Sequence, residues 1–92
     1  MRPASDPVAA IGAALDEQVG SQLPSDMRQY LLEDFPIADE ADTVEDYLYQ
    51  AVRRNIPVEK NLLKMISEDI IPKARGPQKD LIARYSEELL AI

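Results

Sequence analysis

Apolar residues recur along most of the chain at intervals of three and four positions, and they alternate at intervals of two almost nowhere. Intervals of three and four place side chains on one face of an α-helix, whereas alternation is typical of a strand. Residues that end helices interrupt the pattern at Gly20, Pro36, Asn55 and Pro72. The sequence therefore predicts an all-α fold, a compact single-domain bundle of about five short helices.

Caps and breakers set the expected boundaries of these helices. Thr43 is expected to cap the third helix in a capping box with Asp46, and Asn55 is expected to end it in the left-handed conformation. Pro57 is expected to open the fourth helix in its first turn. We expect helices over residues 7–19 and 26–34, between Thr43 and Asn55, over 57–71, and from Gly76-Pro77 nearly to the C-terminus.

The large side chains divide into core candidates and surface candidates. Tyr30, Tyr47 and Tyr85 fall on the apolar stripes and are expected in the core, with their hydroxyls at its rim. Tyr49 lies off the stripe of the third helix and is expected to face solvent or a partner. An exposed apolar patch is expected from the residues that stand beyond the stripes: Leu32, Tyr49, Leu63 and Leu90.

Length and hydropathy limit where the protein can act. A chain of 92 residues makes one domain, 1–92, in which residues 1–6 are expected to be a flexible N-terminus. The longest stretch without a charge, Pro7 to Leu15, is far shorter than the ~20 apolar residues of a membrane span. The same stretch is too weakly apolar for a signal peptide. We therefore expect a cytoplasmic protein with no membrane contact.

The chain has no Cys and no His, which excludes much chemistry. Zinc, haem and iron–sulfur sites, disulfides, and catalysis by Ser-His-Asp or Cys-His groups all need those residues. A twelve-residue calcium loop placed on Asp34 to Glu45 fails, because Asp39 stands where the turn needs Gly. We expect no enzyme activity, no cofactor and no metal site, although the carboxylates leave a weak, exposed Ca²⁺ or Mg²⁺ site and a carboxylate-only enzyme as alternatives.

The formal net charge of -7 is divided unevenly along the chain. Residues 21–50 hold Arg28 against eight acids, whereas residues 51–92 hold eight bases against six acids. The candidate partner-binding residues are the carboxylates of an acidic segment, residues 33–46, and a neighbouring tyrosine: Glu33, Asp34, Asp39, Glu40, Asp42, Glu45, Asp46 and Tyr49. A candidate basic face consists of Arg53, Arg54, Lys60, Lys64, Lys73 and Arg75.

Two interpretations of this division stay open. Acids gather at helix N-termini and bases at C-termini because each interacts favourably with the helix dipole, by about 0.3–1 kcal/mol. Alternatively, seven carboxylates within fourteen residues form a surface that attracts a basic partner. Direct binding of DNA or RNA is not expected, because a sequence pI of about 4.4 implies long-range repulsion of phosphate.

These observations favour recognition over catalysis. The leading hypothesis is a small non-enzymatic protein–protein interaction module that binds through the acidic segment and the apolar residues beside it. Its partner would be a protein with a basic surface, or a second copy that meets it acid to base. The alternative is an acidic inhibitor, a nucleic-acid mimic or an antitoxin-like protein, that occupies the basic groove of a target enzyme.

One stretch carries a resemblance to a known fold. Residues 70–78, Ile-Ile-Pro-Lys-Ala-Arg-Gly-Pro-Gln, lead into an amphipathic helix and resemble the turn between two helices of death-fold recruitment domains. Those domains are helical modules that assemble through complementary acidic and basic faces, which the resemblance implies for this chain. The resemblance covers fewer than a third of the residues, and five helices are expected here where that fold has six.

Overall fold

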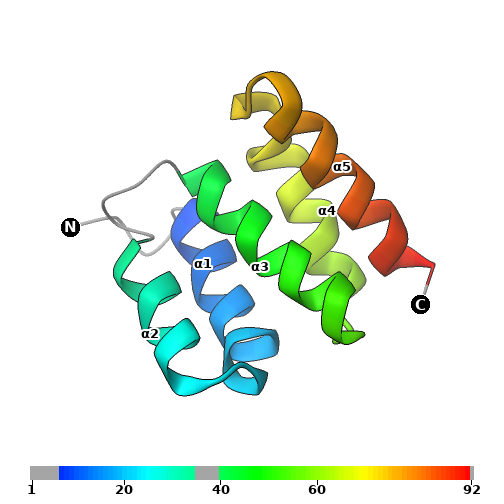
Figure 1. Cartoon of the computed structure of the whole chain (residues 1–92). Helices are drawn as coiled ribbons and strands as arrows, with labels where there is room; N and C mark the ends of the chain where they lie inside the picture. Colours follow the sequence, from blue (N-terminus) through cyan, green and yellow to red (C-terminus); the bar gives the residue numbers. More distant parts are fainter. Residues whose placement is uncertain (1–6, 35–39, 92) are drawn as a thin grey trace.

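The computed structural model describes residues 7–34 and 40–91. The all-α fold is confirmed, because the described residues form helices and turns and contain no strand. The elements are α1 (Pro7–Gln18), η1 (Gly20–Gln22), α2 (Ser25–Asp34), α3 (Glu40–Arg54), α4 (Lys60–Asp69), η2 (Ile71–Lys73) and α5 (Gly76–Leu90), where η marks a 3-10 turn (Figure 1). Among these residues no helix combines the length and the apolar character needed to cross a membrane.

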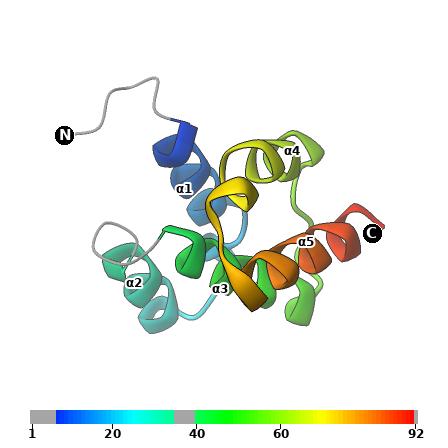
Figure 2. The same ribbon diagram turned by 90° about the horizontal axis from the view of Figure 1, so that it is seen from above.

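The helices pack in two layers. One layer holds α2, α3 and α5, with α3 in the middle, and the other holds α1 and α4 (Figure 2). The most extensive contact is between α3 and α5, and α1 packs mainly on α4. Helices that are neighbours in space are therefore often not neighbours in sequence.

The core lies between the two layers. Burial of one large aliphatic side chain in a core of this kind contributes about 1.5–3 kcal/mol to the free energy of folding. Tyr47 is the largest fully buried side chain, at 1% exposure. The fully buried aliphatic residues come from α1, α3, α4 and α5 and from the ends that join them: Ile11, Leu15, Val19, Val44, Leu48, Ile66, Ile70 and Ile82.

Two predicted helix starts are wrong. Helix α3 begins at Glu40, so Thr43 lies inside its first turn and is fully buried instead of capping the helix. The reason is that Ala41 is also buried, so the packed face begins three residues before Val44. Helix α4 begins at Lys60 and not at Pro57. Ile56 and Val58 are buried while Pro57 is exposed, and this alternation belongs to an extended segment.

The end of α3 is as predicted. Asn55 has φ 56°, the left-handed conformation. The N–H of Ile56 donates to the Ala51 carbonyl at 2.9 Å, and the N–H of Asn55 donates to the Val52 carbonyl at 3.4 Å. This pair of bonds is a Schellman motif, which satisfies carbonyls at the helix end and turns the chain toward α4.

Candidate functional site

The structure corrects two predictions about large side chains. Tyr30 was expected in the core but is 61% exposed, because α2 lies at the edge of its layer and turns only Leu31 fully inward. Leu63 was expected at the surface but is buried, because α4 is covered by α1 on one side and by α5 on another. Leu32, Tyr49 and Leu90 are exposed as predicted, and Tyr47 is buried as predicted.

The acidic segment is divided between two helices. Glu33 is exposed near the end of α2 and accepts a hydrogen bond from the Gln29 side chain at 2.8 Å. Asp34 is the last residue of α2 and Glu40 is the first residue of α3. Asp39 lies outside the described residues, as do residues 1–6, the expected flexible N-terminus.

The remaining candidates form one stripe on α3. Asp42, Glu45, Asp46 and Tyr49 lie on one side of the helix, because Glu45 and Asp46 each stand three or four residues from both Asp42 and Tyr49. Partial burial and the nearby charges of Asp46 and Asp42 together raise the pKa of the Glu45 carboxyl. Asp42 and Asp46 are thus close enough to Glu45 to repel its charge, and a positive charge placed among the three carboxylates would be attracted by all of them.

A tyrosine of α5 completes this stripe. The rings of Tyr49 and Tyr85 lie with centroids 6.0 Å apart and planes inclined at 58°, a tilted aromatic pair. Burial, then the charge of Glu45, raises the pKa of the Tyr85 hydroxyl, which shows that Tyr85 lies within reach of the acidic stripe. We call the set Asp42, Glu45, Asp46, Tyr49 and Tyr85 the acidic-aromatic surface.

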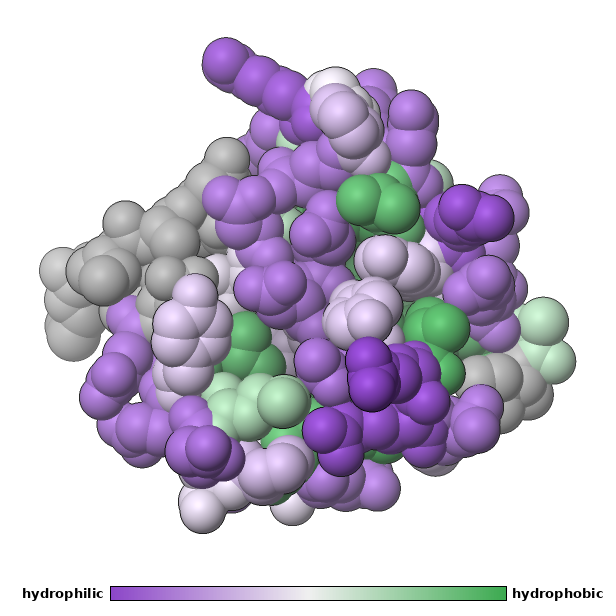
Figure 3. Space-filling view, in the orientation of Figure 1, coloured by the Kyte–Doolittle hydropathy of each residue, from purple (hydrophilic) through white to green (hydrophobic). Residues whose placement is uncertain are grey.

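Side-chain hydrogen bonds hold both ends of this surface. At one end the Gln78 amide of α5 donates to the Asp42 carboxylate of α3. At the other end Arg53 Nη1 donates to the Tyr49 hydroxyl at 3.2 Å. Figure 3 shows the face that carries α3 and α5, where pale and green residues interrupt a mostly hydrophilic surface. The surface is therefore accessible to solvent at Asp42 and Tyr49, partly buried at Glu45, Asp46 and Tyr85, and ordered by contacts between two helices.

The candidate basic residues are all exposed, and α4 spreads them apart. Arg53 and Arg54 end α3, close in sequence to Lys60 at the start of α4. Lys73 ends η2 and Arg75 precedes α5, beyond the other end of α4 (Figure 1). A ten-residue helix is about 15 Å long. The structure thus brings these residues into two groups, with Lys64 between them.

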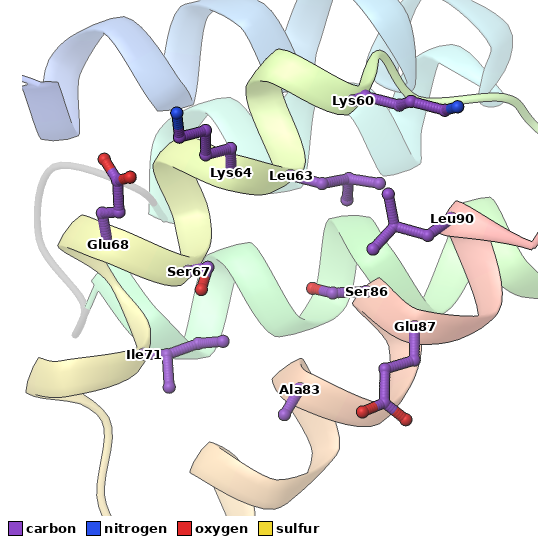
Figure 4. Close-up of a pocket in the computed structure, with 10 residues that line it drawn as sticks. All are labelled: Lys60, Leu63, Lys64, Ser67, Glu68, Ile71, Ala83, Ser86, Glu87 and Leu90. Carbon is purple, nitrogen blue, oxygen red and sulfur yellow. The ribbon is translucent and has the colours of Figure 1, made fainter.

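A hollow of about 330 Å³ lies between α4 and α5 (Figure 4). Leu63, Ile71 and Leu90 supply apolar surface to it. Lys60 and Lys64 stand on the α4 side, and Glu87 stands on the α5 side. Ser86 is buried, and its hydroxyl donates a hydrogen bond to the Ile82 carbonyl at 2.8 Å. The polar group of Ser86 is therefore satisfied within the helix. The hollow is thus an apolar groove with charged rims.

Within residues 7–34 and 40–91, no three acidic, His or Cys side chains are grouped so that they could hold a metal ion. The described carboxylates of α3 follow a line along the helix, whereas Ca²⁺ needs six to eight oxygens around one point. Their arrangement suits a linear series of positive charges better than a single ion.

Comparisons with known proteins return no relative. No family model, no curated protein sequence and no solved structure matches the chain. Function must therefore be argued from the surface itself.

The sequence identified four of the five residues of the acidic-aromatic surface and did not place Tyr85 beside them. Tyr85 was placed in the core because it shares a stripe with Ile82 and Leu89. Its ring is half-buried and reaches Tyr49 across the contact of α3 with α5. No signal within the last helix reveals this, because the pair joins residues 36 positions apart.

Proposed function

We propose that this protein is a non-enzymatic binding module whose acidic-aromatic surface binds a basic segment of a partner protein. The observation that carries the proposal is the juxtaposition of three neighbouring carboxylates, two of which repel the third, with two tyrosine rings on one solvent-accessible strip. A Lys or Arg side chain placed there gains attraction from the carboxylates and a cation–π contact with a ring, worth about 0.5–1 kcal/mol at an exposed site.

The rigidity of the strip also favours binding. Tyr49 is held by Arg53 and by the ring of Tyr85, and Asp42 is held by Gln78. Side chains that are ordered before binding lose little conformational entropy when a partner arrives. Tyrosine is enriched among the residues that dominate binding energy at protein interfaces.

The proposed partner has a basic surface, and we place the module in the cytoplasm.

The charge on this strip predicts how binding responds to salt. Charged groups at the rim of an interface mainly raise the association rate, and added salt screens them. Binding should therefore weaken steeply between low and physiological ionic strength. A partner held mainly by apolar contacts would not show this dependence.

The test compares two variants of equal net charge as baits in host extract. One variant removes the acids of the strip by Asp42→Asn, Glu45→Gln and Asp46→Asn. The matched control removes three exposed acids elsewhere by Glu17→Gln, Glu59→Gln and Asp80→Asn. We expect the wild type and the control to capture the same protein and the first variant to lose it at least about tenfold. Equal capture by all three baits would refute the proposal.

The captured partner also decides between the two function classes. A partner that DNA displaces from the bait would instead indicate the acidic inhibitor, which occupies a nucleic-acid groove. The described carboxylates argue for the module, because Asp42, Glu45 and Asp46 are concentrated along one helix. A nucleic-acid mimic needs carboxylates at phosphate-like intervals over a broad face.

A further inference from the structure

The groove between α4 and α5 is a second surface, separate from the acidic-aromatic surface. The residues that line it from α4 and η2 are spaced as one helical stripe, which includes Lys60, Lys64 and Ile71. The residues that line it from α5, which include Glu87 and Leu90, form another. Tyr85, which belongs to the acidic-aromatic surface, does not line the groove.

The apolar part of the groove is incompletely covered. Leu63 is buried in its floor, but Leu90 at its edge is 48% exposed. Figure 4 shows the Leu90 side chain pointing toward Leu63 across the hollow. The Leu90 side chain would become fully buried only if another molecule packed over it and over the hollow.

The charges of the groove indicate what packs there. The chain carries a net charge of -7, so two copies repel each other over most of their surface. The groove is lined by two lysines, Lys60 and Lys64, and two glutamates, Glu68 and Glu87, so its own charge balances. Lys60 on the α4 rim lies at the same end of the groove as Glu87 on the α5 rim, whereas Lys64 lies toward the other end with Glu68 (Figure 4).

A two-fold axis along the groove makes this surface complementary to itself. Rotation about that axis lays the α4 rim of one copy over the α5 rim of the other. Lys60 of each copy then faces Glu87 of the partner copy, and the two Leu90 side chains meet over the hollows. Pairing of this kind, in which each contact occurs twice, is the usual geometry of protein dimers.

We propose that a second copy of this chain occupies the groove, forming a symmetric dimer in which the α4 rim of each copy packs on the α5 rim of the other. The pairing uses a neutral surface, unlike the acid-to-base assembly expected from the sequence. It leaves both acidic-aromatic surfaces uncovered. Dimer formation therefore does not depend on the proposed function, and either can fail without the other.

The test measures mass by analytical ultracentrifugation from micromolar to millimolar concentration. We expect the wild type to dimerise and Leu90→Asp to weaken the dimer at least about tenfold. Lys60→Glu alone and Glu87→Lys alone should each be monomeric, because each places like charges opposite one another. Lys79→Glu and Glu17→Lys are the matched controls, since they change the net charge equally at exposed positions outside the groove.

The decisive sample is an equimolar mixture of Lys60→Glu and Glu87→Lys. Opposite charges then face each other at both contacts, so the mixture should form a mixed dimer although neither variant dimerises alone. Circular dichroism checks that the variants are folded, which exposed charge changes should allow. A wild type that stays monomeric at every concentration, a dimer indifferent to these charges, or a mixture that stays monomeric would each overturn the proposal.

Discussion

Arg28 of α2 donates two parallel hydrogen bonds to Asp16 of α1, from Nε to Oδ1 and from Nη2 to Oδ2, each 2.9 Å long. This fork-to-carboxylate geometry raises the pKa of the Arg28 guanidinium through the hydrogen bond and the charge of Asp16. The pair joins α2 to α1 across the turn η1. The turn itself must pass close to the Asp16 carboxylate, and Gly20 is the residue at the point of approach.

Gly20→Ala should therefore destabilise the fold. A Cβ at this position would lie 2.5 Å from Asp16 Oδ1 and 3.5 Å from Arg28 Cγ. The carboxylate would have to move and lose its geometry with Arg28, at a cost of about 1–3 kcal/mol in the free energy of unfolding. Urea denaturation measures this. In an Asp16→Ala background the same substitution should cost much less, and an equal cost in both backgrounds would show that the carboxylate is not the obstacle.

Tyr47 predicts a loss of stability at high pH. Burial, with a smaller contribution from the charge of Asp16, raises the pKa of the Tyr47 hydroxyl to about 12, and Arg28 opposes the shift. The folded state thus favours the protonated phenol more than the unfolded state does. That stability is complete below the ordinary pKa of 10.0 and disappears as the pH rises from there to about 12.

The size of the effect is about 2–3 kcal/mol, from about 1.4 kcal/mol per pKa unit. Thermal or urea unfolding at a series of pH values should show it as the difference between wild type and Tyr47→Phe. The variant lacks the titrating hydroxyl, so repulsion among the other ionised groups cancels in the comparison. Parallel pH dependence in the two proteins would mean that Tyr47 ionises as easily in the folded state as in the unfolded state.

A side chain of α1 binds the backbone just before the first residue of α4. Gln18 Oε1 accepts a hydrogen bond of 2.9 Å from the backbone N–H of Glu59, which immediately precedes the first helical residue. Glu59 makes no capping bond with its own side chain. Gln18→Met should therefore lower the free energy of unfolding by about 0.5–1.5 kcal/mol. The control is Gln50→Met, because the Gln50 amide oxygen accepts a hydrogen bond from Arg54 on the same helix, and its loss should matter less.

Asn55 should respond in opposite directions to two small substitutions. Its φ of 56° is strained for residues with a Cβ but not for glycine. Asn55→Ala should cost about 1 kcal/mol of stability, whereas Asn55→Gly should be neutral or slightly stabilising. Measured melting temperatures should thus rank Gly at or above wild type and Ala below it. A more stable Ala variant would argue against the left-handed helix end.

Glu45 offers a test that separates stability from binding. Because its pKa is raised, its ionised form is less favourable in the folded state than in the unfolded state, and stability declines as the pH rises through that pKa. At neutral pH Glu45→Gln should therefore stabilise the fold by a few tenths of a kcal/mol, because a neutral amide costs less to bury than a carboxylate and is not repelled by Asp46 and Asp42. The same substitution should weaken capture of the proposed basic partner. A gain in stability with unchanged binding would remove Glu45 from the binding surface.

Signals within single helices were predictable from the sequence, and contacts between distant helices were not. The Pro7 start, the Asn55 end and the exposure of Tyr49 follow from local chemistry and helical periodicity. The predictions that were wrong have a common cause, the packing of whole helices against one another. Thr43 is buried where a cap was expected, and Tyr30 is exposed where a core residue was expected, because packing of whole helices sets the width of each buried face.

The candidate site shows the same division. The acidic residues and Tyr49 are visible in the sequence because charge and periodicity mark them. Tyr85 joins them only because α5 packs along α3, and the groove exists only because α5 also packs on α4. Both surfaces thus depend on α5, whose neighbours in space could not be inferred from periodicity.

The packing of α1 on α4 has a consequence during synthesis. The ribosome makes the N-terminal helix first, but the helix that covers its apolar side begins more than forty residues later, at Lys60. Until then Ile11 and Leu15 have no α4 to pack against, so a nascent chain of this length exposes them. Packing of this core should therefore be delayed until α4 has left the exit tunnel, and during that interval the apolar side of α1 is accessible to other proteins.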